Sequence, residues 1–164
     1  MKSHRSRVQR LTAQAKYPKL MPVYGRDYRV HLGPGPVYDT PYADDRARPV
    51  VIYWFGHDDI DDYLHEVGHA ANTTFCPEPR DCEVFKHLIG GPDRSWYWDR
   101  PAMEESNEPD PYCEGFADLF SLAQLHRTAV GIRGFDIPAT IYTRPVPVIR
   151  FRRALRAIIE ARGG

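Results

Sequence analysis

The sequence of 164 residues has no long apolar run and no excess of either charge. A membrane-spanning helix needs about 20 consecutive, predominantly apolar residues, so the sequence predicts no segment that spans a membrane. The balance of 22 basic and 22 acidic residues argues against a general electrostatic partner such as duplex DNA or an anionic membrane. We therefore expect no membrane partner, and we do not expect a nucleic-acid partner.

Cysteine is scarce. Cys76, Cys82 and Cys113 are the three present, and an odd number does not suggest a framework of disulfides. The spacing of Cys76 and Cys82, with His87 downstream, is poor for a structural zinc site. We expect reduced, partly buried thiols, and a Cys76–Cys82 bridge stays open as an alternative if the protein works outside the cytosol.

The N-terminus lacks the apolar stretch of a secretory signal, which predicts a cytoplasmic protein. Export by a route that leaves no such mark is the alternative. The length fits one domain with one core. We expect a monomer in which residues 1–20 form a basic, partly disordered segment and residues 21–164 form the single domain. Residues 3–16 allow a short helix, with fraying as an equal alternative.

Two strands are legible in the sequence. Residues 49–55 are β-branched and aromatic and end at a glycine, which is the clearest strand pattern in the chain. Residues 22–31 alternate less regularly and predict a second strand. Prolines, aspartates and glycines in residues 33–48 predict a loop. A further extended piece is expected within residues 139–149.

Three longer helices are predicted from apolar positions that recur at three- and four-residue steps. They cover residues 59–73, capped by Asp58 or Asp59, residues 111–130 and residues 147–162. Between the first two, residues 76–111 are rich in proline and should be mostly irregular, with a short helix near 81–89.

The first of these helices contains His65-Glu66-Val67-Gly68-His69, an H-E-x-x-H motif. Histidines four residues apart lie on one face of a helix, about one turn from each other, so both imidazoles can bind one zinc ion. The adjacent Glu66 is placed to act on a water molecule rather than on the metal. Two solvated histidines on a surface helix are the plain alternative.

A catalytic zinc ion takes three protein ligands, so a third must come from elsewhere in the chain. Glu114, on the helix predicted at 111–130, is the candidate that we favour. Asp118 follows four residues later on the same face, where it can accept the free ring N–H of a zinc-bound histidine. Glu104 and Glu105 are competing ligands, but they sit in a predicted loop.

The combination of His65-Glu66-x-x-His69 with Glu114-Gly-Phe-Ala-Asp118 resembles the gluzincin branch of the zincin metallopeptidases. It is similar to small bacterial and phage zincin domains, including those related to anthrax lethal factor. The resemblance covers about 60 residues and leaves both basic ends unmatched. It implies an α+β fold with a small mixed sheet over the metal helix. It also implies one Zn²⁺ per chain, held by the two histidines and Glu114, with Glu66 as the catalytic base and Asp118 supporting a ligand.

These features predict a zinc metallopeptidase that hydrolyses peptide bonds in a protein or peptide substrate. The tetrahedral oxyanion needs a further hydrogen-bond donor, and the sequence does not choose among Tyr112, Tyr97, His87 and His126. One alternative is a catalytically silent, zincin-shaped binding or regulatory module of a phage or mobile element, holding a partner through its loops and basic ends. Another is a helical scaffold without metal.

Overall fold

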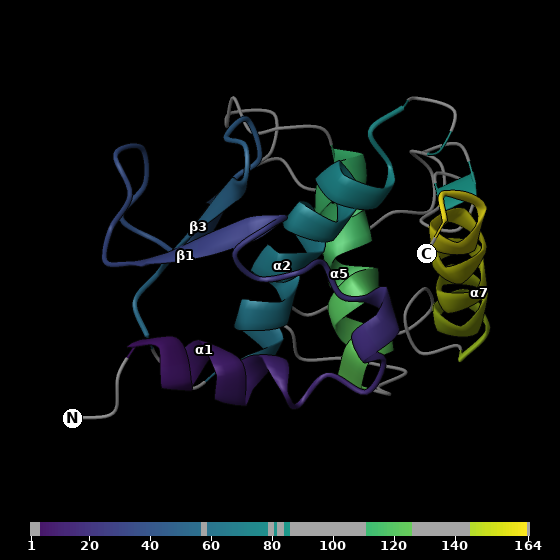
Figure 1. The fold of residues 1–164 in the computed structure, drawn as a ribbon, viewed down its shortest axis with the longest axis horizontal. Helices are drawn as coiled ribbons and strands as arrows, with labels where there is room; N and C mark the ends of the chain where they lie inside the picture. The colour runs from purple at the N-terminus through teal and green to yellow at the C-terminus, as the bar shows by residue number, and fades with distance from the viewer. Residues whose placement is uncertain are drawn as a thin grey trace.

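A computed structural model of the chain describes residues 4–56, 59–78, 81, 84–85, 111–125 and 145–163. The described elements comprise α-helices and a small mixed sheet, so the predicted α+β class is confirmed. In chain order they are α1 (His4–Thr12), the 3-10 helix η1 (Pro18–Leu20), β1 (Tyr28–Leu32), β2 (Tyr42–Asp44), β3 (Val50–Trp54), α2 (Ile60–Phe75), α5 (Pro111–Leu125) and α7 (Pro145–Ala161). Figure 1 shows the sheet at one end of the molecule and α7 at the other.

The sheet has the strand order β1-β3-β2, with β1 parallel to β3 and β2 antiparallel to it. The strand predicted at 49–55 is confirmed as β3. The strand predicted at 22–31 begins only at Tyr28, because a turn with Gly25 at a φ of +89° precedes it and the Val23 N–H donates to the Asp27 carboxylate at 2.7 Å. The loop predicted at 33–48 was wrong for residues 42–44, since β2 lies there and pairs with β3.

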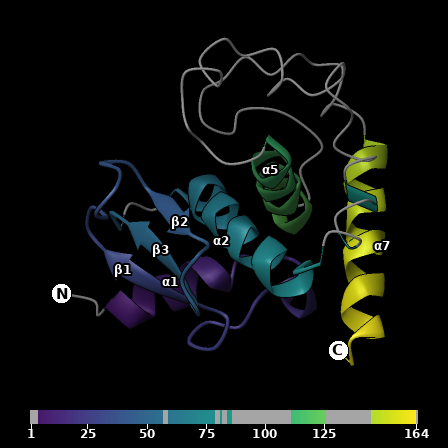
Figure 2. The same ribbon diagram turned by 90° about the horizontal axis from the view of Figure 1, so that it is seen from above.

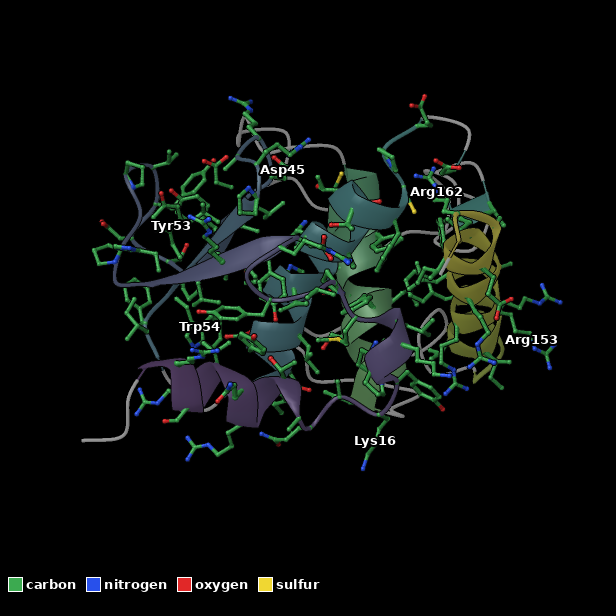
Figure 3. The ribbon with its side chains drawn as sticks, in the orientation of Figure 1. Lys16, Asp45, Tyr53, Trp54, Arg153 and Arg162 are labelled. Carbon is green, nitrogen blue, oxygen red and sulfur yellow. The ribbon has the colours of Figure 1, made fainter. Side chains whose placement is uncertain are left out.

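Alternation along β3 directs one face of the sheet into the core. Val50, Ile52 and Trp54 are buried, whereas Val51 and Tyr53 are partly exposed. The labelled Trp54 and Tyr53 lie on opposite sides of the sheet in Figure 3. The Trp54 ring packs edge-on against Tyr63 of α2, with 5.7 Å between the ring centroids. This contact packs α2 against the sheet.

The helix predicted at 59–73 is confirmed as α2 and extends two residues further. Asp59 is its N-cap: the side-chain Oδ1 accepts the N–H of Asp61 at 3.0 Å and the N–H of Asp62 at 3.3 Å. Carboxylates in this first turn also suit the positive end of the helix dipole. Most of the middle of α2 is buried, because the sheet covers one side of it and α5 the other, as Figure 2 shows.

Helix α5 packs against α2, and α7 packs against α5 on the side away from the sheet. Phe116 of α5 and Phe151 of α7 meet edge-on with centroids 4.9 Å apart, deep in the core. The extended piece predicted within 139–149 was wrong for its last residues, because α7 begins at Pro145. Proline is tolerated in the first turn of a helix, where the backbone N–H has no intrahelical acceptor. Residues 126–144 lie outside the described part.

The basic N-terminal segment is helical over His4–Thr12 and contributes to the core. Val8 and Leu11 are only 2% and 1% exposed, and Leu20 in η1 is equally well covered. Of the short helix predicted near 81–89, residues 81, 84 and 85 are described and are helical. None of the helices in the described residues combines the length and apolarity needed to cross a bilayer.

Candidate metal centre

Two imidazole rings meet at the middle of α2. Nε2 of His65 lies 3.2 Å from Nε2 of His69, and the ring centroids are 4.9 Å apart. The i, i+4 spacing explains the meeting, because it places the two side chains one above the other on the same helical face. His65 is fully buried and His69 is half-buried, so the pair lies at the edge of the core rather than in free solution.

The other ring nitrogen of His65 is held from α5. Its Nδ1 lies 2.6 Å from Oδ1 of Asp118, whose side chain is almost as deeply buried as that of the histidine. An ionised carboxylate only accepts hydrogen bonds, so Nδ1 carries the proton in this contact. In the neutral imidazole Nε2 then carries no proton, and its lone pair is directed toward His69. The contact therefore fixes both the tautomer and the orientation of His65.

This arrangement fits a tetrahedral zinc ion. Two nitrogens bound to one zinc at about 2.0–2.1 Å are about 3.3 Å apart, close to the 3.2 Å between these rings. Zinc-binding histidines commonly donate their second ring N–H to a carboxylate, as His65 does to Asp118. The same Nε2 contact also forms a hydrogen bond between two neutral rings, in which His69 donates to His65.

The register between α2 and α5 gives the location of position 114. The helices run antiparallel, because the Ser121 hydroxyl donates to the Asp61 carbonyl near one end and the Asn72 amide donates to Cys113 Sγ near the other. Position 114 lies one turn before Asp118 on α5 and therefore belongs to the stretch level with His69. The Glu114 side chain lies outside the part of the chain that the structure describes.

Within the described part, no group of three His, Cys, Asp or Glu side chains is arranged to hold one metal ion. Because the Glu114 side chain is not among those described, this result does not bear on the predicted set of three ligands. Other predicted candidates also lie outside the described residues or side chains: Glu104, Glu105, Tyr112, Tyr97, His87, His126 and Cys82. Of the remaining thiols, Cys76 is buried and Cys113 half-buried.

Glu66 follows His65 directly and is only 2% exposed. A carboxylate is rarely buried to this extent, because removal from water disfavours its charge unless polar groups compensate. Its position in the middle of α2, between the sheet and α5, shields it from bulk solvent. A carboxylate that follows a predicted zinc ligand directly in the sequence and is largely removed from water is suited to proton transfer.

Gly68, inside the motif, is a structural requirement that the sequence reading missed. A Cβ at this position would lie 2.7 Å from the Ala117 Cα and 3.0 Å from the Ala117 carbonyl oxygen. The absence of a side chain therefore lets α2 and α5 approach closely, which brings Asp118 within reach of His65. A glycine in a helix interior lowers the stability of the helix by about 1 kcal/mol relative to alanine. The presence of such a glycine inside the motif was the sequence signal that could have indicated a close helix contact.

A network of hydroxyl groups lies near the N-terminal part of α2. The Tyr63 hydroxyl is 3.1 Å from that of Tyr28 and 3.0 Å from that of Thr12, so α1, β1 and α2 share one buried polar contact. Burial raises the pKa of Tyr63 above its ordinary value, and the nearby Tyr28 raises it further. Burial likewise raises the pKa of Tyr28. Both hydroxyls therefore stay protonated and support the helix one turn before Glu66.

No family model matches the sequence, and the searches of curated proteins and solved structures found no match. The relation to gluzincins accordingly stays a resemblance based on two short motifs.

Proposed function

We propose that this protein is a zinc-dependent metallopeptidase with its active site between α2 and α5. The observation that carries the proposal is the 3.2 Å separation of the His65 and His69 Nε2 atoms, with Asp118 bonded to the far nitrogen of His65. A surface helix with two solvated histidines would not need a buried carboxylate aligned with one of them. The buried pairing therefore favours a metal centre over that plain alternative.

His65, His69 and Glu114 would hold one Zn²⁺. When bound, the ion acts as a Lewis acid that favours attack of water on a peptide carbonyl. The position of Glu114 on α5, one turn from Asp118, supports its part in this set. Three ligands from two helices that pack through Gly68 and Ala117 give the site a rigid support, since neither helix can shift without disturbing that contact.

Asp118 keeps the proton on Nδ1 of His65, which leaves Nε2 available to a ligand. Glu66 accepts a proton from the attacking water and then delivers it to the nitrogen of the leaving amine. The proton count balances over the two steps, because the carboxylate returns to its ionised form. The burial of Glu66 and His65 strengthens the electrostatic interactions of both groups by limiting the screening by water.

The decisive experiment uses the full chain purified without a histidine tag. Elemental analysis should find about one zinc per chain, and His65→Ala should lose most of it. His31→Ala is the matched control, because His31 is an exposed histidine on the outer face of the sheet. A zinc content near zero in the wild type, or equal losses in both variants, would contradict the metal centre.

Catalysis is tested separately on a mixture of unfolded proteins, with cleavage read by mass spectrometry. Glu66→Gln should keep zinc and lower cleavage at least about a hundredfold, because the proton acceptor is lost. Glu78→Gln makes the same chemical change at an exposed position and should cleave normally. Cleavage by the Glu66→Gln variant at the wild-type rate would rule out the mechanism, while bound zinc without any wild-type cleavage would indicate a silent binding module.

A further inference from the structure

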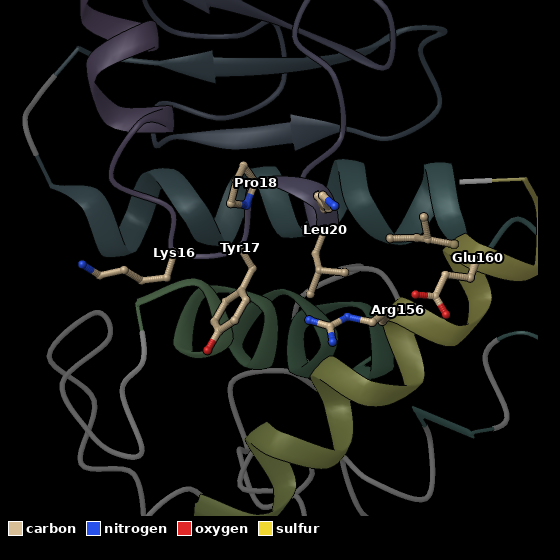
Figure 4. Close-up of a pocket in the computed structure, with 8 residues that line it drawn as sticks. Lys16, Tyr17, Pro18, Leu20, Arg156 and Glu160 are labelled. Carbon is tan, nitrogen blue, oxygen red and sulfur yellow. The ribbon is translucent and has the colours of Figure 1, made fainter.

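A second pocket, separate from the metal centre, opens between η1 and the C-terminal half of α7. Its volume is about 880 Å³, within the range of about 300–1,000 Å³ that is usual for ligand sites. Pro18 and Ile159 provide apolar lining that is open to solvent, and Tyr17 lies beside them. Figure 4 shows these walls, with η1 facing α7.

The lining carries an excess of positive charge. Lys16, Lys19 and Arg156 contribute three exposed cations, against the single carboxylate of Glu160. The chain as a whole has equal numbers of basic and acidic residues, so this excess is local. It arises because the fold brings the basic N-terminal segment next to the basic C-terminal helix, two segments more than 100 positions apart in sequence.

One wall of the pocket is held in place by Gln124 at the end of α5. The Tyr17 N–H donates to Gln124 Oε1 at 3.0 Å, and Gln124 Nε2 donates to the Tyr17 carbonyl at 3.3 Å. The Lys16 N–H donates to the Gln124 carbonyl at 2.8 Å. Gln124 itself is 1% exposed. The backbone that presents the two lysines is therefore fixed before any ligand arrives.

The Tyr17 ring is fixed as well. The Arg152 guanidinium lies over it, 4.5 Å from the ring centroid, and also donates to the Tyr17 hydroxyl. In Figure 4 Arg156 and Lys16 extend on opposite sides of this ring. A single phosphate group cannot contact two cations separated by an aromatic ring. An elongated ligand with several negative charges can.

We propose that this pocket binds an acidic peptide segment with an apolar side chain between its carboxylates. The carboxylates would pair with Lys16, Lys19 and Arg156, and the apolar side chain would cover Pro18 and Ile159. Glu160 disfavours a nucleic acid, because an unbroken row of phosphates would have to pass this carboxylate, whereas a peptide can place an uncharged residue there. The proposal does not depend on zinc or on peptidase activity.

The test measures fluorescence anisotropy of a labelled probe, Asp-Glu-Glu-Leu-Glu-Asp, with the full-length protein. The probe should bind, and raising the salt concentration should weaken binding because the charges are exposed. Lys19→Glu and Arg156→Glu should each lower the affinity about fivefold, since each replaces an attraction with a repulsion. Arg153→Glu is the matched control: Arg153 is exposed on the same helix, points away from the body of the molecule in Figure 3 and should leave affinity unchanged.

Replacing the leucine of the probe with serine should also weaken binding, which separates apolar contact from charge alone. Circular dichroism should show that each variant keeps the wild-type helix content. No binding by the wild type would overturn the proposal, as would equal losses in Arg153→Glu and Arg156→Glu. A single-stranded oligonucleotide that displaces the probe with higher affinity than unlabelled peptide would also overturn it, in favour of nucleic acid.

Discussion

Nδ1 of His65 and Oδ1 of Asp118 are 2.6 Å apart in the protein core, although 53 positions separate the two residues in sequence. Both side chains are at most 3% exposed, so the contact is shielded from solvent. A hydrogen bond to an ionised partner is stronger than one between neutral groups, and burial increases this difference. The position of α5 therefore determines the tautomer of His65, which is a predicted metal ligand.

Asp118→Asn should weaken zinc binding roughly 10- to 100-fold while the fold stays intact. The amide can still accept a hydrogen bond from His65 Nδ1, but it carries no charge and makes the ring a poorer ligand. Competition with a fluorescent zinc chelator measures the affinity. Asp39→Asn changes an exposed aspartate in the same way and should bind zinc like the wild type. Equal affinity of Asp118→Asn and the wild type would show that this carboxylate does not support a ligand.

Elements with strong local patterns were predictable. β3 and α2 were found because alternation and helical periodicity are properties of adjacent residues, and the cap at Asp59 is a local feature too. β2 was missed because it has only three partly buried residues and is stabilised by pairing with β3. That pairing is a tertiary interaction, which local composition does not show.

The candidate site was predictable to a similar extent. The i, i+4 spacing of His65 and His69 is enough to infer that their rings meet, and the spacing of Glu114 and Asp118 placed both on one face. The contact between Gly68 and Ala117 was not inferred, because it depends on how two helices pack. The basic pocket was missed for the same reason, since its charges come from opposite ends of the chain.

Tyr28 should make stability depend on pH in alkaline solution. Burial raises its pKa in the folded state, whereas in the unfolded chain it titrates near 10. Above about pH 10 the unfolded state releases a proton that the folded state retains, so the free energy of unfolding falls by up to about 1.4 kcal/mol per pH unit from this group. Tyr28→Phe should flatten the decline in urea titrations between pH 9 and about 11.

Tyr38→Phe is the control for that measurement, because Tyr38 is 40% exposed. It should follow the wild-type pH profile. Identical slopes for Tyr28→Phe and the wild type would mean that the Tyr28 hydroxyl ionises as easily in the folded protein as in the unfolded one.

Asp59→Ala should lower the free energy of unfolding by about 1 kcal/mol, since two N–H groups of the first turn of α2 lose their acceptor. Asp59→Asn keeps an oxygen acceptor and loses only the charge, so it should retain most of the stability. Chemical denaturation measures both. Equal losses in the two variants would attribute the effect to charge rather than to the hydrogen bonds of the cap.

Gly68→Ala should destabilise the protein and weaken zinc binding together. The new Cβ would meet the Ala117 backbone at 2.7 Å, and backbone atoms cannot move aside as a side chain can. Overpacking of this kind costs about 1–3 kcal/mol, which equals or exceeds the ~1 kcal/mol that alanine contributes through helix propensity. Separating the helices would also lengthen the contact between His65 and Asp118. Thr73→Ala, at a half-buried position of α2, gains propensity without this clash and should not destabilise. Denaturation and zinc competition measure the two effects, and an unchanged or raised stability of Gly68→Ala would refute the close approach of α2 and α5.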